Sequence, residues 1–217
     1  MKKQLKQTSK PVLVLLAVAG WFALVVQFYL YLNGRSAPAT ELIIRYFTFF
    51  TILNNGIIAA CSTTLLLAPS SSWGKFFSKN TTLTAMAVNI TIVGTVYNTI
   101  LRFLWNPQGM QLVVDELLHL VIPGLYILFW LIGVRKGGLK WNSFLSWTIF
   151  PIVYLVIVLA RGAISNYYPY PFLDAAKLGY PKVLFNLLGI AIAFIVFALL
   201  FIAVDKWMDK RASRYTG

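Results

Sequence analysis

The sequence offers few side chains that could do covalent chemistry. Among its 217 residues it has one histidine, His119, and one cysteine, Cys61. A protein metal site usually needs several His, Cys or carboxylate ligands, so we expect no metal site here. The lack of a P-loop or GxGxxG segment argues against a nucleotide cofactor, and we expect no cofactor. What remains is a hydroxyl beside one imidazole, and an imidazole can activate a threonine hydroxyl that lies within hydrogen-bond reach.

Two threonines lie among other polar side chains in the otherwise apolar stretch ELIIRYFTFFTILNN, which begins at Glu41. On an α-helix Arg45, Thr48, Thr51 and Asn55 would share one face, with Glu41 one turn before Arg45. Inside a membrane such a face is expected to lie against protein or water and not against lipid. The alternative is structural: each threonine bonds to a carbonyl one turn behind it, and the asparagines join neighbouring helices.

Two carboxylates precede the single histidine. Asp115 lies four residues before His119 and Glu116 three, so either carboxylate could lie beside the imidazole on a helix. Thr48 and His119 each lie eight residues inside the expected outer end of a helix, which puts both about 12 Å below that end. This depth permits the two side chains to meet, but it does not show that their helices are neighbours.

Membrane-spanning helices must position these side chains. Hydrophobic residues make up 59% of the chain and charged residues only 12%, whereas about a quarter of a soluble domain is charged. A spanning helix needs roughly 20 mostly apolar residues. We therefore predict an all-α polytopic membrane protein with a single transmembrane domain over residues 1–217. Its six spans are expected at about 11–33, 41–68, 81–104, 111–134, 142–165 and 181–205.

The charge distribution predicts the orientation of this bundle. The formal net charge is +13, and 13 of the 19 basic residues fall on one side if the N-terminus is cytoplasmic. Since cytoplasmic loops carry an excess of Lys and Arg, both termini are predicted to be cytoplasmic. We attribute the basic excess to topology and to attraction by membrane lipids, and we expect no nucleic-acid partner. The apolar stretch from Val12 to Leu32 is too long for a signal peptide, so we expect the first helix to be retained in the cell membrane.

Three short segments resemble a known family. They are Phe47-Thr48-Phe49 in the second span, His119 followed by Pro123 in the fourth, and Tyr170-Pro171-Phe172-Leu173-Asp174 before the last. Their order along the chain is similar to that of the androgen-induced and androgen-dependent membrane hydrolases, where the last segment ends in Glu. The resemblance implies a multi-pass threonine hydrolase that cleaves fatty acid esters of hydroxy fatty acids. It also implies that Thr48 is the nucleophile and His119 the base.

Other polar residues of the outer half have expected roles on this hypothesis. Either Asp115 or Glu116 would orient the imidazole. Asn98 and Asn186 are alternative donors of a hydrogen bond to the oxyanion.

Two arginines complete the expected site. Arg102 and Arg161 could hold a fatty acid carboxylate through paired hydrogen bonds. Salt bridges from these arginines to Asp115, Glu116 or Asp174 are an equal alternative.

The sequence thus predicts an intramembrane lipid ester hydrolase whose substrate comes from the bilayer. Two other classes stay open: a small-molecule transporter or channel, and a lipid-binding membrane protein without catalysis. A transporter would be expected to carry polar residues through to the inner face or to have paired broken helices. The inner halves of the spans offer little of that kind beyond Ser62, Thr63 and Thr64.

Overall fold

The computed structural model describes residues 9–34 and 36–214. Within them, six helical segments are long and apolar enough to cross a membrane. These segments are Lys10–Asn33, Phe50–Leu67, Asn80–Leu104, Met110–Gly133, Trp141–Ser165 and Tyr180–Ser213. The prediction of an all-α chain with six apolar spans is confirmed, and it indicates an integral multi-pass membrane protein. Lys2, Lys3, Lys6 and Arg35, which entered the charge count, lie outside the described residues.

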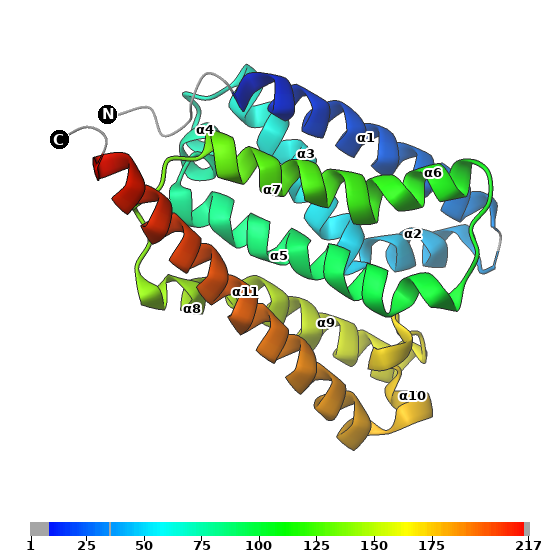
Figure 1. The fold of residues 1–217 in the computed structure, drawn as a ribbon. Coiled ribbons are helices and arrows are strands. Elements are labelled where there is room, and N and C mark those ends of the chain that lie inside the picture. Colours follow the sequence, from blue (N-terminus) through cyan, green and yellow to red (C-terminus); the bar gives the residue numbers. More distant parts are fainter. Residues whose placement is uncertain (1–8, 35, 215–217) are drawn as a thin grey trace.

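The elements follow one another as an up-and-down bundle, in which α1 begins and α11 ends at the same end of the molecule (Figure 1). The α-helices are α1 (Lys10–Asn33), α2 (Ala39–Phe47), α3 (Phe50–Leu67), α4 (Ser72–Phe77), α5 (Asn80–Thr99), α6 (Met110–Glu116), α7 (Ile122–Gly133), α8 (Phe144–Trp147), α9 (Ile149–Ser165), α10 (Ala175–Leu178) and α11 (Tyr180–Arg214). A π-helical turn, Leu117–Val121, joins α6 to α7, and we call it the π-turn. Short 3₁₀ turns cover Leu101–Leu104, Trp141–Ser143 and Pro171–Leu173. We call the end of the bundle with α2, α6 and α10 the site end, and the end with α4 and α8 the opposite end.

Large apolar side chains fill the half of the bundle near the opposite end. Tyr126, Phe129 and Trp130 on α7 are buried among residues of the main core. Their polar atoms are paired, because the Trp130 indole N–H donates to Thr84 at 2.9 Å and the Tyr126 hydroxyl donates to the Leu83 carbonyl at 3.2 Å. The region around these three side chains is therefore close-packed core.

A buried carboxylate fixes the opposite end. Asp205 on α11 is 0% exposed and accepts hydrogen bonds from the backbone N–H groups of Gly137 and Leu139 and from the Asn80 amide. These bonds tie α11 to the connection after α7 and to the start of α5. The helix continues to Arg214, beyond the predicted end at residue 205, because the residues after Asp205 are mostly good helix formers.

The second predicted span, 41–68, is not one continuous helix. It breaks between α2 and α3, where Phe49 is extended with φ −77° and ψ 123°. The Thr48 hydroxyl and the Thr48 N–H both bond to the Arg45 carbonyl, at 2.6 and 3.0 Å, and a continuous helix would give that carbonyl to the N–H of Phe49. The aromatic and β-branched residues around the break are also weak helix formers.

Candidate functional site

The helix break creates a free helix N-terminus inside the protein. Thr51 lies in the first turn of α3, where backbone N–H groups have no partner within the helix. The Thr51 N–H is directed instead to the hydroxyl oxygen of Tyr170, at 3.4 Å. The helix dipole places partial positive charge at this point, which favours an oxyanion or an alkoxide there.

The π-turn around His119 leaves backbone carbonyl groups without their usual α-helical donors. Pro123 has no N–H to give to the His119 carbonyl, and the N–H of Ile122 bonds to Leu117 instead of Leu118. Asparagines of two neighbouring helices donate to the carbonyls at this turn. Asn98 on α5 donates to the His119 carbonyl at 3.1 Å, and Asn55 on α3 donates to the Leu118 carbonyl at 3.2 Å.

Asn55 also links the first turn of α3, which carries Thr51, to the π-turn, which carries His119. Its amide nitrogen lies 2.9 Å from the Thr51 carbonyl oxygen and 3.2 Å from the Leu118 carbonyl oxygen. One buried amide group therefore joins the first turn of α3 to the residue before His119. This fixes the position of Thr51 relative to the π-turn.

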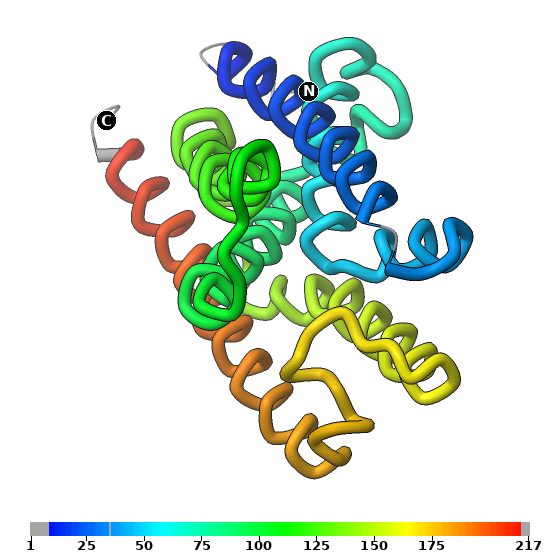
Figure 2. The backbone as a smooth tube through the Cα atoms, turned by 90° about the vertical axis from the view of Figure 1, so that its right-hand side faces the viewer, coloured from blue at the N-terminus to red at the C-terminus, as the bar shows by residue number. Residues whose placement is uncertain are grey.

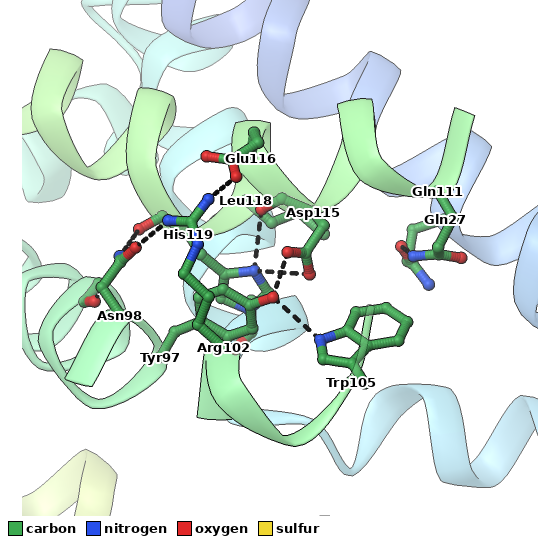
Figure 3. A network of polar contacts seen from close by, with 12 residues as sticks. Gln27, Tyr97, Asn98, Arg102, Trp105, Gln111, Asp115, Glu116, Leu118 and His119 are labelled. Atoms are coloured by element: carbon green, nitrogen blue, oxygen red, sulfur yellow. Dashed lines mark hydrogen bonds and ion pairs between the residues drawn. The ribbon is translucent and has the colours of Figure 1, made fainter. Parts of the chain in front are cut away.

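The imidazole of His119 is held on two sides (Figure 3). The His119 Nδ1 atom lies 2.9 Å from the Asp115 carbonyl oxygen and 3.3 Å from the Asp115 carboxylate. Because a carbonyl oxygen can only accept, Nδ1 carries the proton, and Nε2 of the neutral ring is free to accept one. The ring of Tyr97 stacks on the imidazole with 3.7 Å between centroids.

The Asp115 carboxylate is itself fixed by a chain of hydrogen bonds. The Tyr97 hydroxyl donates to its second oxygen, and the Trp105 indole N–H donates to the Tyr97 hydroxyl at 3.0 Å (Figure 3). Asp115 is 3% exposed, so this buried carboxylate is fully engaged by the imidazole and the phenol. The arrangement orients His119 in the way that a carboxylate orients the imidazole of a catalytic triad.

A cavity of about 500 Å³ lies at the site end, and both Thr51 and His119 line it. Asp115, Tyr97 and Tyr170 line the same cavity. Its volume falls in the range of sites for small molecules. No group of three or more His, Cys, Asp or Glu side chains able to hold a metal ion lies within the described residues.

Thr48 is not among the residues that line this cavity. Its hydroxyl donates to the Arg45 carbonyl, and its own carbonyl accepts from the Tyr154 hydroxyl at 2.8 Å. Thr48 and Thr51 are equally buried, at 8% exposed each. The structure therefore places Thr51, one helical turn further along, in the cavity with His119.

The structure also separates the two carboxylates before His119. Asp115 contacts the imidazole, whereas Glu116 forms an ion pair with Arg102. Asn98 accepts a hydrogen bond from Arg102 and donates to the Gly94 and His119 carbonyls, so both N–H groups of its amide are in use. Asn98 thus stabilises the π-turn by donating to a backbone carbonyl, and Arg102 is paired with Asn98 and Glu116.

The remaining expected site residues lie away from this cavity. Arg161 pairs with Glu41 at 2.6 Å, and Arg45 pairs with the same carboxylate at 2.7 Å. Asn186 donates to the Phe172 carbonyl at 3.0 Å and holds the 3₁₀ turn before α10. Neither Arg161 nor Asn186 lines the cavity.

Three members of the site were not identified from the sequence. Tyr97 lies on α5 and Trp105 directly after the 3₁₀ turn that follows α5, whereas Asp115 lies on α6, and no short spacing indicates that these side chains meet. Tyr170 belongs to a segment that carried the family resemblance, but its contact with Thr51 crosses 119 residues of sequence.

No family model matches the chain, and neither a curated protein nor a solved structure matches it.

Proposed function

We propose that the protein is an intramembrane hydrolase of lipid esters, with Thr51 as nucleophile, His119 as base and Asp115 as the group that orients the imidazole. The observation that carries this proposal is the shared cavity of Thr51 and His119, in which Nδ1 of the imidazole is already engaged by Asp115. A threonine hydroxyl becomes a useful nucleophile when such a base takes its proton.

The proposed reaction has two steps. The Thr51 oxygen attacks the ester carbonyl while its proton passes to Nε2 of His119; the C–O bond then breaks, and His119 returns the proton to the leaving alcohol. Water next attacks the acyl-threonine and gives one proton to His119. Release of the carboxylic acid returns that proton to Thr51, so the enzyme is regenerated without a cofactor.

The first turn of α3 supports the charge that develops on the carbonyl oxygen. The N–H groups of this turn have no partner within the helix, the helix dipole is positive here, and the Thr51 N–H bonds to the Tyr170 hydroxyl oxygen at 3.4 Å. Burial raises the pKa of Tyr170, so its phenol stays protonated at neutral pH and can donate a hydrogen bond. We assign the oxyanion contacts to these groups, since Asn98 and Asn186 donate to backbone carbonyls.

We also propose that both termini are cytoplasmic, which puts the site in the outer half of the cell membrane. The described basic residues are concentrated at the opposite end, where α4, α8 and the start of α1 lie (Figure 1). Cytoplasmic loops are rich in such residues.

Two threonine variants test the nucleophile. Purified protein in detergent would be incubated with a nitrophenyl acyl ester and, separately, with a fluorophosphonate that reacts with activated hydroxyls. Thr51→Ala is expected to lose covalent labelling and to lower ester turnover at least about a hundredfold. Thr48→Ala is the matched control, because its hydroxyl is equally buried but bonded to its own helix, and it is expected to keep both activities.

His119→Ala, like Thr51→Ala, should lose both labelling and ester turnover, because a nucleophile and its base act as a unit. If Thr48→Ala loses labelling while Thr51→Ala keeps it, the nucleophile has been assigned to the wrong threonine. If both variants hydrolyse and label like the parent protein, neither threonine is the nucleophile, and if the parent protein neither hydrolyses nor labels, the hydrolase proposal is refuted.

A further inference from the structure

A second cavity adjoins the first and has a different character. It has a volume of about 200 Å³ and lies between α5, α9 and α11. Its lining is mostly apolar and includes Ile92, Val96, Leu155, Leu187, Ala191 and Phe194. No charged side chain is among the described residues that line it. We call it the apolar cavity, and the cavity of His119 the polar cavity.

The two cavities meet at the proposed nucleophile. Thr51, Leu101 and Tyr170 line both of them. An ester carbonyl placed at Thr51 would therefore have one substituent on each side. The question is which part of the ester occupies which cavity.

The chemistry of the leaving group answers it. The alcohol receives its proton from His119, so the alcohol must lie on the side of the imidazole, in the polar cavity. The acyl chain then extends from Thr51 in the other direction. The apolar cavity follows α11 from Leu187 to Ile195, about 12 Å along the helix axis, which suits an extended hydrocarbon chain.

The apolar cavity also reaches the outer surface of the bundle. Ile152 on α9 is 55% exposed and Ile195 on α11 is 40% exposed, and both line it. Figure 2 shows the segment after α9 running through α10 to α11 at the site end. Between α9 and α11, on the side of this segment away from the site end, an acyl chain in the bilayer can enter the cavity from the lipid-facing surface.

From these observations we infer that the apolar cavity binds the acyl chain of the ester, and that α9 and α11 set the chain length that is accepted. This inference rests on the proposed hydrolase activity for its direction, but the binding of a hydrocarbon chain can be measured without turnover.

The first test is a chain-length series. Nitrophenyl esters with acyl chains from acetyl to palmitoyl would be compared in the parent protein and in Ala191→Phe, which adds a ring to the lining of the apolar cavity. The optimum is expected to move to shorter chains, with kcat/KM for the parent's preferred chain falling about tenfold or more. Ile192→Phe is the control, because Ile192 is 54% exposed and does not line the cavity, and its profile should match the parent.

The second test is independent of catalysis. A palmitoyl ester with a diazirine at the methyl end of its chain would be photolysed with Thr51→Ala protein in detergent. Labelled peptides are expected from α9 and α11, and excess unlabelled palmitoyl ester should suppress the labelling. Without turnover in any variant, saturable labelling of these helices would support the acyl site while refuting the hydrolase. The acyl site itself is refuted if labelling is not saturable, or if Ala191→Phe and Ile192→Phe give the same chain-length profile.

Discussion

Replacing asparagine by leucine is expected to change thermal stability in opposite directions at two positions of α5, Asn98 and Asn89. Asn98 donates both amide N–H groups, one of them to the His119 carbonyl, which Pro123 leaves without its helical donor. Asn89 is 5% exposed, and its amide oxygen has no hydrogen-bond partner within the described chain. Leucine has nearly the shape of asparagine, so each change removes the polar groups with little change of volume.

The expected magnitudes follow from hydrogen-bond accounting. Asn98→Leu leaves a carbonyl without its donor, which costs about 1–3 kcal/mol. For a domain of this size that lowers the unfolding temperature by about 2–12 °C. Asn89→Leu removes a buried acceptor that is already unpaired, so its unfolding temperature is expected to stay equal to the parent's or to rise.

The chain provides its own reporter for the measurement. Cys61 is the single cysteine and is 0% exposed, so a thiol-reactive fluorogenic dye responds when the bundle opens on heating in detergent. Ester hydrolysis would be measured in parallel, and Asn98→Leu is expected to lower it because the π-turn loses a support. An unfolding temperature for Asn98→Leu equal to or above that of Asn89→Leu would show that the asparagine does not stabilise the turn.

Three further changes address the site and its surroundings. Tyr97→Phe removes the hydrogen bond to Asp115 but keeps the ring stacked on the imidazole; it should lower ester turnover about tenfold with unchanged substrate affinity, and an unchanged turnover number would contradict this role. Pro123→Ala restores a backbone N–H that can bond to the His119 carbonyl, so thermal stability is expected to be kept or raised while turnover falls, and equal turnover would count against a functional role of the π-turn. The hydrogen bonds from Arg45, and then from Arg161, lower the pKa of Glu41 below its ordinary value of 4.5. The stabilisation from these bonds is therefore present above that pH and is lost as the pH falls below it. Glu41→Gln should reduce the loss of unfolding temperature at acidic pH, and an unchanged loss would refute this contribution.

Composition and hydrophobic length were sufficient to predict the helical class and the six spans. They were insufficient at Thr48 and Phe49, because the break depends on the Thr48 N–H bonding to the Arg45 carbonyl and on the extended conformation of Phe49, and neither follows from hydrophobic length. A helical wheel drawn across that position places Thr48 and Thr51 on one face. The break places Thr48 at the end of α2 and Thr51 in the first turn of α3.

Local spacing identified part of the site around His119. The i, i+4 relation to Asp115 is a property of one helix, and the structure shows that contact. The spacing of Glu116 was equally suggestive, but Arg102 on another element pairs with it. Contacts of Tyr97 with Asp115 and of Tyr170 with Thr51 depend on how separate helices pack, and the sequence of a single chain carries no local signal for them.

Asp205 gives α11 two ends of different stability. At the opposite end its carboxylate bonds to Gly137, Leu139 and Asn80, whereas at the site end α11 is held through α10 and the turn that Asn186 supports. Local opening of a helix requires breaking the contacts that anchor it, so amide hydrogen exchange along α11 should become faster from Asp205 toward Tyr180. Since Phe194, Ala198 and Phe201 of α11 belong to the main core, a change in the gap between α11 and α9 would be confined to the turns of α11 nearest Tyr180.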